Sequence, residues 1–303
     1  METVFQATGL QKRYGHAKAL SGLNMSIPKG SIYGIVGKNG AGKTTLIRLL
    51  CGLQEPTAGE YTLYGISCRS RQIGKVRRRT GAVVESPSFS PEYTAEENIR
   101  QQYRILGMPS FDGIGELLEL VGLSDTGKKK ARDFSLGMRQ RLGIAIALAG
   151  SPDFLILDEP TNGLDPQGII DIRELILKLN HEQDITVLIS SHNLDELSRL
   201  ATHFGFIDSG RMVREVTADD LRAACRKCIR ATVSDVKILC RVLDEAGLEY
   251  DVLSDTEADI YGSISVTQLT LRLSERGCEL KTLRERDESL ESYYINLVGG
   301  SKE

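Results

Sequence analysis

The sequence lacks any long hydrophobic run. Its longest apolar stretch, LGIAIALAG at Leu142–Gly150, is about half as long as the roughly 18 residues that a membrane-spanning helix needs. Near the N-terminus, Lys12 and Arg13 precede no apolar segment, so we expect no signal peptide. The chain also contains no internal repeat and no low-complexity tract. We therefore expect an ordinary globular protein without a membrane span of its own.

A strong excess of charge of one sign is absent as well. The net charge of −3 provides none of the basic surface that nucleic-acid binding requires, so no nucleic acid is expected as a partner. The six cysteines are scattered along the chain, which favours reduced cytosolic thiols over a disulfide framework. One pair, Cys225 and Cys228, has CxxC spacing but no second pair at zinc spacing, so we interpret both as ordinary thiols on a helix.

What the sequence does contain is an ordinary globular composition, with 41% apolar and 26% charged residues. In its first part, predicted strands alternate with predicted helices. Short apolar runs at Ser31–Gly37, Phe154–Asp158 and Thr186–Ser190 are typical of parallel strands covered on both faces. Helices are predicted at Lys43–Leu53 and Pro166–Leu179. The fold class is therefore α/β with a mainly parallel sheet.

The pattern changes near Glu215. The residues that follow predict strand, helix, strand, strand, helix and strand in that order, and an amphipathic segment ends the chain. This order is the split βαβ pattern. We expect residues 1–214 to form one domain and residues 215–303 to form a small α+β accessory domain, whose role the sequence does not indicate.

The stretch GKNGAGKTT contains the G-x-x-x-x-G-K-[ST] pattern of a phosphate-binding loop, between a predicted strand and a predicted helix. Glycines let the backbone wrap closely around phosphates, and N–H groups at the helix N-terminus face the anion. Lys43 is expected to reach the β- and γ-phosphates, and the Thr44 hydroxyl to bind Mg²⁺. The residues expected to bind nucleotide here are Gly37, Asn39, Gly40, Ala41, Gly42, Lys43, Thr44 and Thr45.

A second motif, FLILDE at Phe154–Glu159, places two acids at the end of a predicted parallel strand. We expect this strand end to lie beside the neighbouring phosphate loop, so that Asp158 holds Mg²⁺ directly or through water. Glu159 is then placed to orient and polarise an attacking water molecule. Together the two motifs predict a Mg²⁺-dependent nucleoside triphosphate hydrolase, without indicating what the released energy drives.

Four more stretches accompany these two motifs. KRYG contains Tyr14, FSLGM contains Ser135 and Gly137, TNGLDP contains Asp165, and SSHNLDE contains His192. Taken together, the motifs resemble the ATP-binding-cassette (ABC) ATPases, the nucleotide-binding subunits of ABC transporters. FSLGM is similar to their LSGGQ-type signature, TNGLDP to the D-loop and SSHNLDE to the switch region. By itself, the FSLGM stretch is equally compatible with a simple helix cap.

The resemblance covers about residues 4–230 and implies a role for each matching residue. Tyr14 would stack on the adenine of ATP. His192 would contact the γ-phosphate and hold the attacking water together with Glu159. The cofactors implied are therefore ATP and Mg²⁺, and the activity implied is ATP hydrolysis.

The resemblance also implies a partner. Ser135 and Gly137 would bind the γ-phosphate of a nucleotide held by a second subunit, and Asp165, the D-loop acid, is expected among the nucleotide-binding residues. Because one chain carries one phosphate loop and one signature, two cassettes arranged head-to-tail are implied, as a homodimer with ATP between them. A helical subdomain at about residues 88–150 would receive a membrane partner.

Glu85 departs from the family pattern. In GAVVESP, the residues Ala82, Val83 and Val84 predict the end of a buried strand. Glu85 follows, where the family normally has a glutamine that contacts Mg²⁺ and the attacking water. We expect Glu85 to replace this glutamine as a catalytic residue and metal ligand; the alternative is an ordinary loop acid. A carboxylate charge within about 4 Å of Mg²⁺ would be attracted by roughly 4 kcal/mol at an effective dielectric constant of about 20. Repulsion from the γ-phosphate offsets part of this attraction, so these two energies do not decide whether the glutamate strengthens or weakens binding.

A glutamate at this position, the SLGM signature and the C-terminal extension resemble the bacitracin-type and lantibiotic-immunity subgroup of ABC ATPases. That resemblance implies an ATPase subunit on the inner face of the cell membrane. It would drive export of a peptide antibiotic or similar hydrophobic compound through separate polytopic membrane subunits. Two alternatives stay open: an importer ATPase, and a soluble ABC ATPase acting on a macromolecular complex. The transported compound is not indicated.

Overall fold

The structure is a computed structural model that describes residues 2–225, 228–262, 264–286 and 290–299. It divides into two compact units, Met1–Ala218 and Asp219–Glu303. The division falls a few residues after the boundary expected from the sequence.

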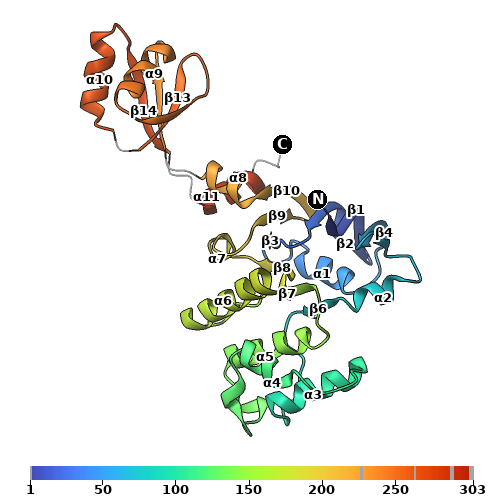
Figure 1. Ribbon diagram of the computed structural model, residues 1–303. Helices are drawn as coiled ribbons and strands as arrows, with labels where there is room; N and C mark the ends of the chain where they lie inside the picture. The colour runs from blue at the N-terminus through green and yellow to red at the C-terminus, as the bar shows by residue number, and fades with distance from the viewer. Residues whose placement is uncertain (1, 226–227, 263, 287–289, 300–303) are drawn as a thin grey trace. The chain divides into compact units, whose positions relative to one another are not determined.

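A six-stranded sheet forms the centre of the first unit. Its strands are β3 (Ile32–Val36), β6 (Thr80–Val83), β7 (Phe154–Asp158), β8 (Thr186–Ser191), β9 (His203–Asp208) and β10 (Arg211–Thr217). They lie in the order β10-β9-β3-β8-β7-β6 (Figure 1), and only β10 runs antiparallel to its neighbour. Every residue of β3, β7 and β8 is buried, as expected for parallel strands covered on both faces. The predicted α/β class with a mainly parallel sheet is confirmed.

Strand β6 corrects one prediction. It ends at Val83 rather than Val84, it lies at the edge of the sheet beside β7, and its Ala82 is exposed. A short apolar run cannot distinguish an edge strand from a central one, because an edge strand also buries part of its length against the helices that cover the sheet.

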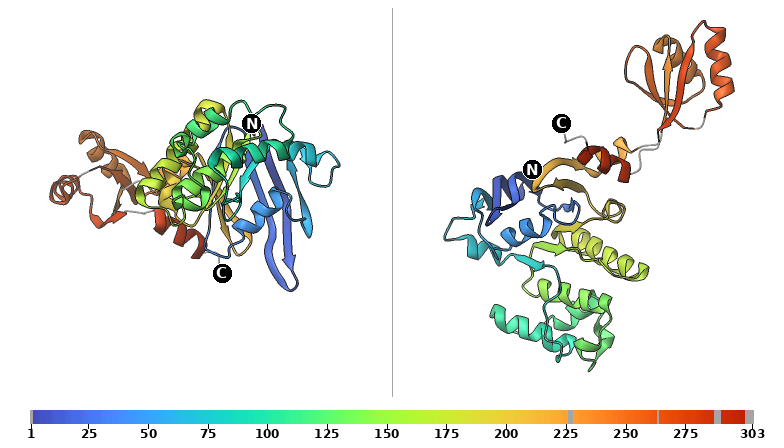
Figure 2. Two further views of the ribbon diagram at one scale, coloured as in Figure 1. Left: turned by 90° about the horizontal axis from the view of Figure 1, so that it is seen from below. Right: turned by 180° about the vertical axis from the view of Figure 1, so that it is seen from behind.

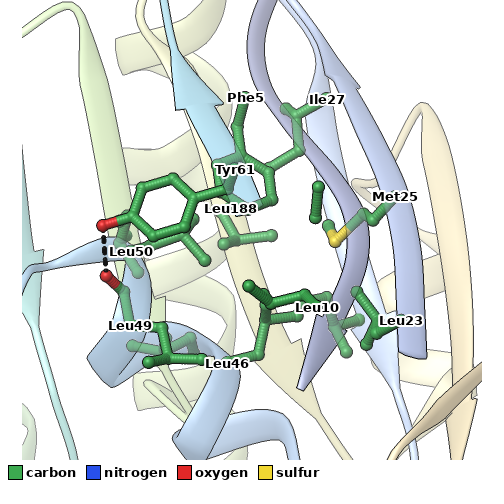
Figure 3. Packing of buried hydrophobic residues seen from close by; sticks show 14 of the residues in the cluster. Phe5, Leu10, Leu23, Met25, Ile27, Leu46, Leu49, Leu50, Tyr61 and Leu188 are labelled. Carbon is green, nitrogen blue, oxygen red and sulfur yellow. Dashed lines mark hydrogen bonds between the residues drawn. The ribbon is translucent and has the colours of Figure 1, made fainter. Parts of the chain in front are cut away.

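A second, antiparallel sheet packs against the helix that follows the phosphate loop. Its strands are β1 (Thr3–Tyr14), β2 (Ala17–Pro28), β4 (Ala58–Leu63) and β5 (Ile66–Ser67), in the order β2-β1-β4-β5. Helix α1 (Lys43–Leu50) belongs to the same buried cluster, in which Leu46 and Leu49 lie among apolar side chains of these strands (Figure 3). The Tyr61 hydroxyl donates to the Leu49 carbonyl at 2.8 Å. Helix α1 ends earlier than predicted, and Gly52 just beyond it has a φ of +73°.

The remaining helices of the first unit fall into two groups. Helices α3 (Ala95–Leu106), α4 (Ile114–Leu120) and α5 (Leu136–Leu148) lie together at the β6 end of the unit (Figures 1 and 2). They fall within the predicted helical subdomain. The others are α2 (Ile73–Arg77), α6 (Pro166–Gln183) and α7 (Leu194–Ser198), with short 3₁₀ turns at Ser124–Thr126 and Ala131–Asp133. None of the helices in the described ranges is long and apolar enough to cross a membrane.

The second unit has the predicted element order. Its elements are β11 (Cys228–Val233), α9 (Val236–Glu245), β12 (Glu249–Val252), β13 (Glu257–Tyr261), α10 (Val266–Glu275) and β14 (Leu280–Arg286). The sheet order is β12-β13-β11-β14, all antiparallel, and apolar residues of α9 and α10 share one core with the sheet. Helices α8 (Ala218–Ala224) and α11 (Leu290–Gly299) precede and follow this set in the sequence.

The CxxC pair does not lie on a helix as expected. Cys225 follows the end of α8, and Cys228 is the buried first residue of β11. The two residues between them lie outside the described part of the chain. The predicted first strand of the second unit, CIRATV, already begins at Cys228, so placing both cysteines on one helix conflicts with it.

Candidate functional site

The carboxyl ends of four parallel strands meet at one edge of the central sheet, and each is followed by a segment predicted to be functional. The phosphate loop follows β3, His192 follows β8, Glu159 follows β7 and Glu85 lies just after β6. The acids of the second motif do lie beside the phosphate loop, but their strand is not its direct neighbour, since β8 lies between β3 and β7. Sequence order does not encode this insertion.

Ser190, on the inserted strand β8, is hydrogen-bonded to both acids of the second motif. Its hydroxyl donates to Asp158 Oδ1 at 2.6 Å and accepts from the Glu159 backbone N–H at 3.0 Å. Ser190 was not among the predicted site residues. Its place at the start of the SSHNLDE motif was the available signal, but only the strand order shows that it lies against the acids.

The phosphate loop leads directly into helix α1. Gly42 caps the helix with a φ of +112°, and a Cβ atom there would lie 2.8 Å from the Ala19 carbonyl oxygen, so only glycine fits without a shift. Gly40 has a φ of +82°. No side chain caps α1, so the N–H groups of its first turn are available to an anion. The other loop residues are distributed as follows: Gly37 and Ala41 are buried, Asn39 is exposed, and Thr44 and Thr45 are half-buried.

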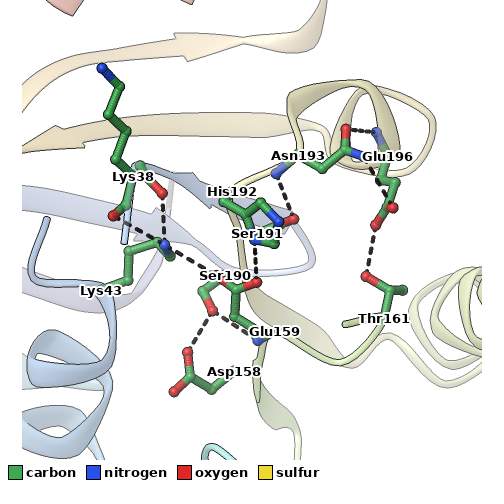
Figure 4. A network of polar contacts seen from close by, with 11 residues as sticks. Lys38, Lys43, Asp158, Glu159, Thr161, Ser190, Ser191, His192, Asn193 and Glu196 are labelled. Carbon is green, nitrogen blue, oxygen red and sulfur yellow. Dashed lines mark hydrogen bonds and ion pairs between the residues drawn. The ribbon is translucent and has the colours of Figure 1, made fainter. Parts of the chain in front are cut away.

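The side chains of Lys43, Glu159 and His192 meet beside this loop (Figure 4). Lys43 Nζ lies 3.1 Å from Glu159 Oε1, and His192 Nδ1 lies 2.7 Å from Glu159 Oε2. Lys43 also donates to the Gly37 carbonyl at 2.7 Å and has only 6% of its side chain exposed. Glu159 is 19% exposed and has a φ of +50°, a left-handed conformation that non-glycine residues adopt at a cost. One carboxylate therefore joins the loop lysine to the histidine.

Asp158 is buried, with 2% exposure, and only one of its carboxylate oxygens is hydrogen-bonded. Oδ2 is buried without a hydrogen-bond partner in the described part of the chain. A buried carboxylate oxygen left without a donor is costly, so it fits a site completed by a cation or by water held on one.

Ser135, Gly137 and Asp165 lie together elsewhere on the first unit. They line a groove of about 370 Å³ between the starts of α5 and α6. Ser135 caps α5 by accepting from the Met138 N–H at 3.3 Å, and Asp165 caps α6 by accepting from the Gly168 N–H at 3.0 Å. In the described residues, no hydrogen bond or ion pair links the side chains of Ser135 and Asp165 to the phosphate loop. The helix-cap interpretation of Ser135 therefore describes its contacts within one chain.

Tyr14 lies at the end of β1 with 44% exposure. Its hydroxyl donates to Gln54 Oε1, and the Lys12 ammonium lies 5.4 Å from the centre of its ring. Among the described residues, no hydrogen bond joins Tyr14 to the phosphate loop. Its ring face is thus held at the surface by its neighbours rather than by the loop.

Glu85 has a φ of +61°, and its carboxylate is paired with an arginine that the sequence did not single out. Arg48 Nη2 lies 2.6 Å from Glu85 Oε1. Arg48 follows Thr44 by four residues on α1, so the two share a helix face. That spacing was the only sequence signal for Arg48, and it gives no hint of Glu85.

Comparison with known proteins identifies the family. Residues 20–162 match the ABC transporter family model. The chain is 40% identical to the bacitracin transport ATP-binding protein BcrA of Bacillus licheniformis, over 99% of both proteins. It is 43% identical to the lantibiotic transport ATP-binding protein SrtF of Streptococcus pyogenes, over 69% of this chain and 89% of SrtF.

Among solved structures, a dimeric post-hydrolysis form of the ATP-binding cassette MJ0796, bound to ADP and phosphate, is similar to it with a TM-score of 0.64 and 26% identity. The match covers 71% of this chain and 98% of that one. Three findings agree: the family model that matches, the relative that matches along the full length, and the arrangement of the phosphate loop, the acids and the histidine. The chain therefore belongs to the ATP-binding proteins of ABC transporters.

Proposed function

We propose that this chain is the ATP-hydrolysing subunit of an exporter that expels a peptide antibiotic or similar hydrophobic compound through separate membrane subunits. Membership of the ABC family supports ATP hydrolysis coupled to transport. The observation that carries the chemistry is the double contact of Glu159, with Lys43 at 3.1 Å and His192 at 2.7 Å. This contact joins the residue expected at the phosphates to the residue expected at the attacking water.

Magnesium fits the residues at the sheet edge. Mg²⁺ prefers oxygen ligands, and the Thr44 hydroxyl, Glu85 and the unpartnered Oδ2 of Asp158 supply them. In the described residues no cluster of three or more acidic, histidine or cysteine side chains would hold a metal alone, so phosphate oxygens and water would complete its shell. When bound, Mg²⁺ would neutralise charge that develops on the phosphates.

The side chains suggest how water would be activated. Lys43 can exchange its ion pair with Glu159 for the β- and γ-phosphates, which releases Oε1 as a hydrogen-bond acceptor for water. His192 holds the other carboxylate oxygen, so the carboxylate keeps its orientation during the exchange. Glu159 would then accept the proton of the attacking water, while the N–H groups at the start of α1 and Lys43 stabilise the phosphates.

A second cassette would complete the site. The groove with Ser135, Gly137 and Asp165 has no polar link to the phosphate loop of its own chain in the described residues. Facing another copy head-to-tail, the Ser135 hydroxyl and the Gly137 N–H would meet the γ-phosphate held by that copy. The dimeric state of the similar cassette MJ0796 supports this arrangement.

Peptide-antibiotic export is supported by the relatives. BcrA is named for bacitracin transport and SrtF for lantibiotic transport, and the match to BcrA spans both chains almost completely. As a subunit of such an exporter, the chain would be cytoplasmic and bound to the inner face of the cell membrane through its membrane subunits. In the bound nucleotide, the adenine would stack on Tyr14.

The test is a pull-down of the tagged full chain from its native membranes in mild detergent, with mass spectrometry of the proteins that accompany it. We expect polytopic membrane proteins in stoichiometric amounts. A Lys43→Ala chain, matched in amount, serves as control, because assembly with membrane subunits should survive the loss of ATP hydrolysis. Recovery only with ribosomal, DNA-repair or sulfur-assembly proteins would overturn the export proposal and favour a soluble ABC ATPase.

A further inference from the structure

The ion pair between Arg48 and Glu85 extends the site beyond its predicted residues. Nη2 of Arg48 lies 2.6 Å from Oε1 of Glu85, so the guanidinium donates a charge-assisted hydrogen bond to the carboxylate. The contact uses one carboxylate oxygen, and no protein hydrogen bond to Oε2 occurs among the described residues. The carboxylate is thus fixed at one oxygen and open at the other.

The position of Arg48 connects this pair to the phosphate site. Arg48 lies one helical turn after Thr44 on the same face of α1, and both side chains are half-buried. The ion pair therefore fastens Glu85 to the helix whose first turn would bind phosphate and Mg²⁺.

The backbone of Glu85 adds a second restraint. Its φ of +61° is a left-handed conformation, and the N–H of the next residue, Ser86, donates to the Val84 carbonyl at 2.8 Å. Non-glycine residues in this conformation persist only where the surroundings hold them there, and they concentrate at functional sites. With 58% of its side chain exposed, Glu85 would otherwise turn freely in solvent.

The third observation concerns the charges of Glu85 and Arg48. A free carboxylate beside a triphosphate repels it, whereas the glutamine that the family normally carries does not. The Arg48 guanidinium, which is always protonated in proteins, donates a hydrogen bond to the Glu85 carboxylate. Arg48 stays cationic and offsets the charge that Glu85 brings.

We propose that Arg48 is a positioning residue for Glu85: it holds one carboxylate oxygen, offsets the added charge and leaves the other oxygen for Mg²⁺ or the attacking water. This inference rests on the proposed function, because it assumes that Glu85 serves ATP hydrolysis. It would let a glutamate serve where the family resemblance implies a glutamine. Arg48 and Glu85 form one functional unit.

A double-mutant cycle in the full-length chain tests the pair. The variants are Arg48→Met, Glu85→Ala and the double variant, each assayed for kcat and KM at saturating Mg²⁺. With Glu85 present, Arg48→Met should lower kcat about tenfold and change KM by less than about threefold, a coupling expected of residues in contact. With Ala at position 85, the same change should alter kcat by less than about twofold.

Two further measurements separate positioning from a general structural effect. Arg48→Lys keeps the charge and should recover kcat to within about threefold of the wild type, since only the planar fork of arginine is lost. Binding of Mn²⁺ to the ADP-bound chain, followed by electron paramagnetic resonance, needs no turnover. Arg48→Met should weaken Mn²⁺ binding about threefold more with Glu85 than with Ala at that position.

Arg100 and Glu96 on α3 provide a matched control. Their ion pair is also 2.6 Å long and similarly exposed, at 38% and 54% against 35% and 58%. Arg100→Met, Glu96→Ala and their double variant should each change kcat by less than about twofold. Because both pairs are at the surface, the variants should also stay folded.

The outcomes distinguish the two proposals. Equal effects of Arg48→Met in the Glu85 and Ala backgrounds, or a rise in kcat, would overturn the Arg48 inference alone, provided that the wild type hydrolyses ATP. A wild-type chain with neither Mg²⁺-dependent hydrolysis nor ADP-dependent Mn²⁺ binding would overturn the proposed function, and the Arg48 inference with it.

Discussion

Glu159 and Glu85 share an unusual backbone. Glu159 directly follows β7, Glu85 comes two residues after the end of β6, and both have a positive φ, +50° and +61°. Each such conformation costs on the order of 1–3 kcal/mol in a non-glycine residue. At the residue scale, the two strained acids lie at the same sheet edge as the phosphate loop, which is where strain would serve to aim a carboxylate.

Glu159→Gln is the substitution that isolates the proposed base. The amide is the same size as the carboxylate but cannot accept a proton from water, so we expect ATP hydrolysis to fall by about 10²- to 10⁴-fold. ATP binding should be retained, because Lys43 and the loop N–H groups are untouched. Phosphate release and equilibrium ATP binding measure the two effects.

The control for this prediction is Glu182→Gln, an exposed acid near the end of α6 that lies outside the site. It should leave hydrolysis unchanged. If Glu159→Gln retained activity within about threefold of the wild type, the assignment of Glu159 as base would be wrong.

At the scale of helices and strands, local pattern predicted the elements but not their neighbours. Strands β3 and β7 and the start of α1 were predictable, because apolar runs and a glycine-rich turn leave a local signal. The insertion of β8 between β3 and β7 was not, since strand adjacency depends on packing.

The contacts of the candidate site also divide into those that the sequence could predict and those that it could not. The Lys43–Glu159–His192 cluster could be anticipated, because each residue lies in a motif with its own chemical reason. The Arg48–Glu85 pair could not, because it joins two segments 37 residues apart and neither partner points to the other in the sequence. Long-range ion pairs leave no periodic signal.

The start of α3 offers a test at this scale. Thr94 and Glu97 form a capping box, in which the Glu97 carboxylate accepts from the Thr94 N–H at 2.7 Å. That hydrogen bond, and then the one from Lys130, lowers the pKa of Glu97 below its ordinary 4.5. A lowered folded-state pKa stabilises the fold above the unfolded pKa, and this contribution is lost as the pH falls through the folded value.

We therefore expect Glu97→Ala to lower the thermal unfolding temperature at pH 7, with the difference from wild type fading as the pH falls below 4.5. Glu97→Gln is the control: it keeps a hydrogen-bond acceptor without a charge, so its deficit should be smaller. A difference between Glu97→Ala and the wild type that stayed constant from pH 7 into strong acid would contradict the charge-dependent cap.

At the scale of the whole molecule, the proposed function divides the site between two places on the first unit. The phosphate loop and the groove with Ser135 lie on different parts of the first unit, without a polar link in the described residues. Under the proposed function, a second copy would bring its Ser135 groove to the phosphate loop of the first. Hydrolysis would then depend on assembly as well as on the residues of one chain.

Nucleotide should control that assembly. In a Glu159→Gln chain, MgATP should convert monomers into dimers, because ATP persists between the two copies. Adding Gly137→Arg should prevent this by filling the groove. Light scattering after size-exclusion chromatography gives the mass, and Glu119→Arg, an exposed position on α4 outside the groove, is the matched control. Dimers that form equally well with Arg at position 137 would contradict the head-to-tail arrangement.

Export of peptide antibiotics driven by ATP hydrolysis would make the native cells more resistant to these peptides. The most direct measurement is the inhibitory concentration of bacitracin and of a lantibiotic for the native cells, producing either the wild-type chain or equal amounts of the Glu159→Gln chain. We predict that the substitution lowers the inhibitory concentration of at least one of these peptides several-fold. Unchanged values for both, with ATP hydrolysis abolished, would show that this ATPase does not drive their export.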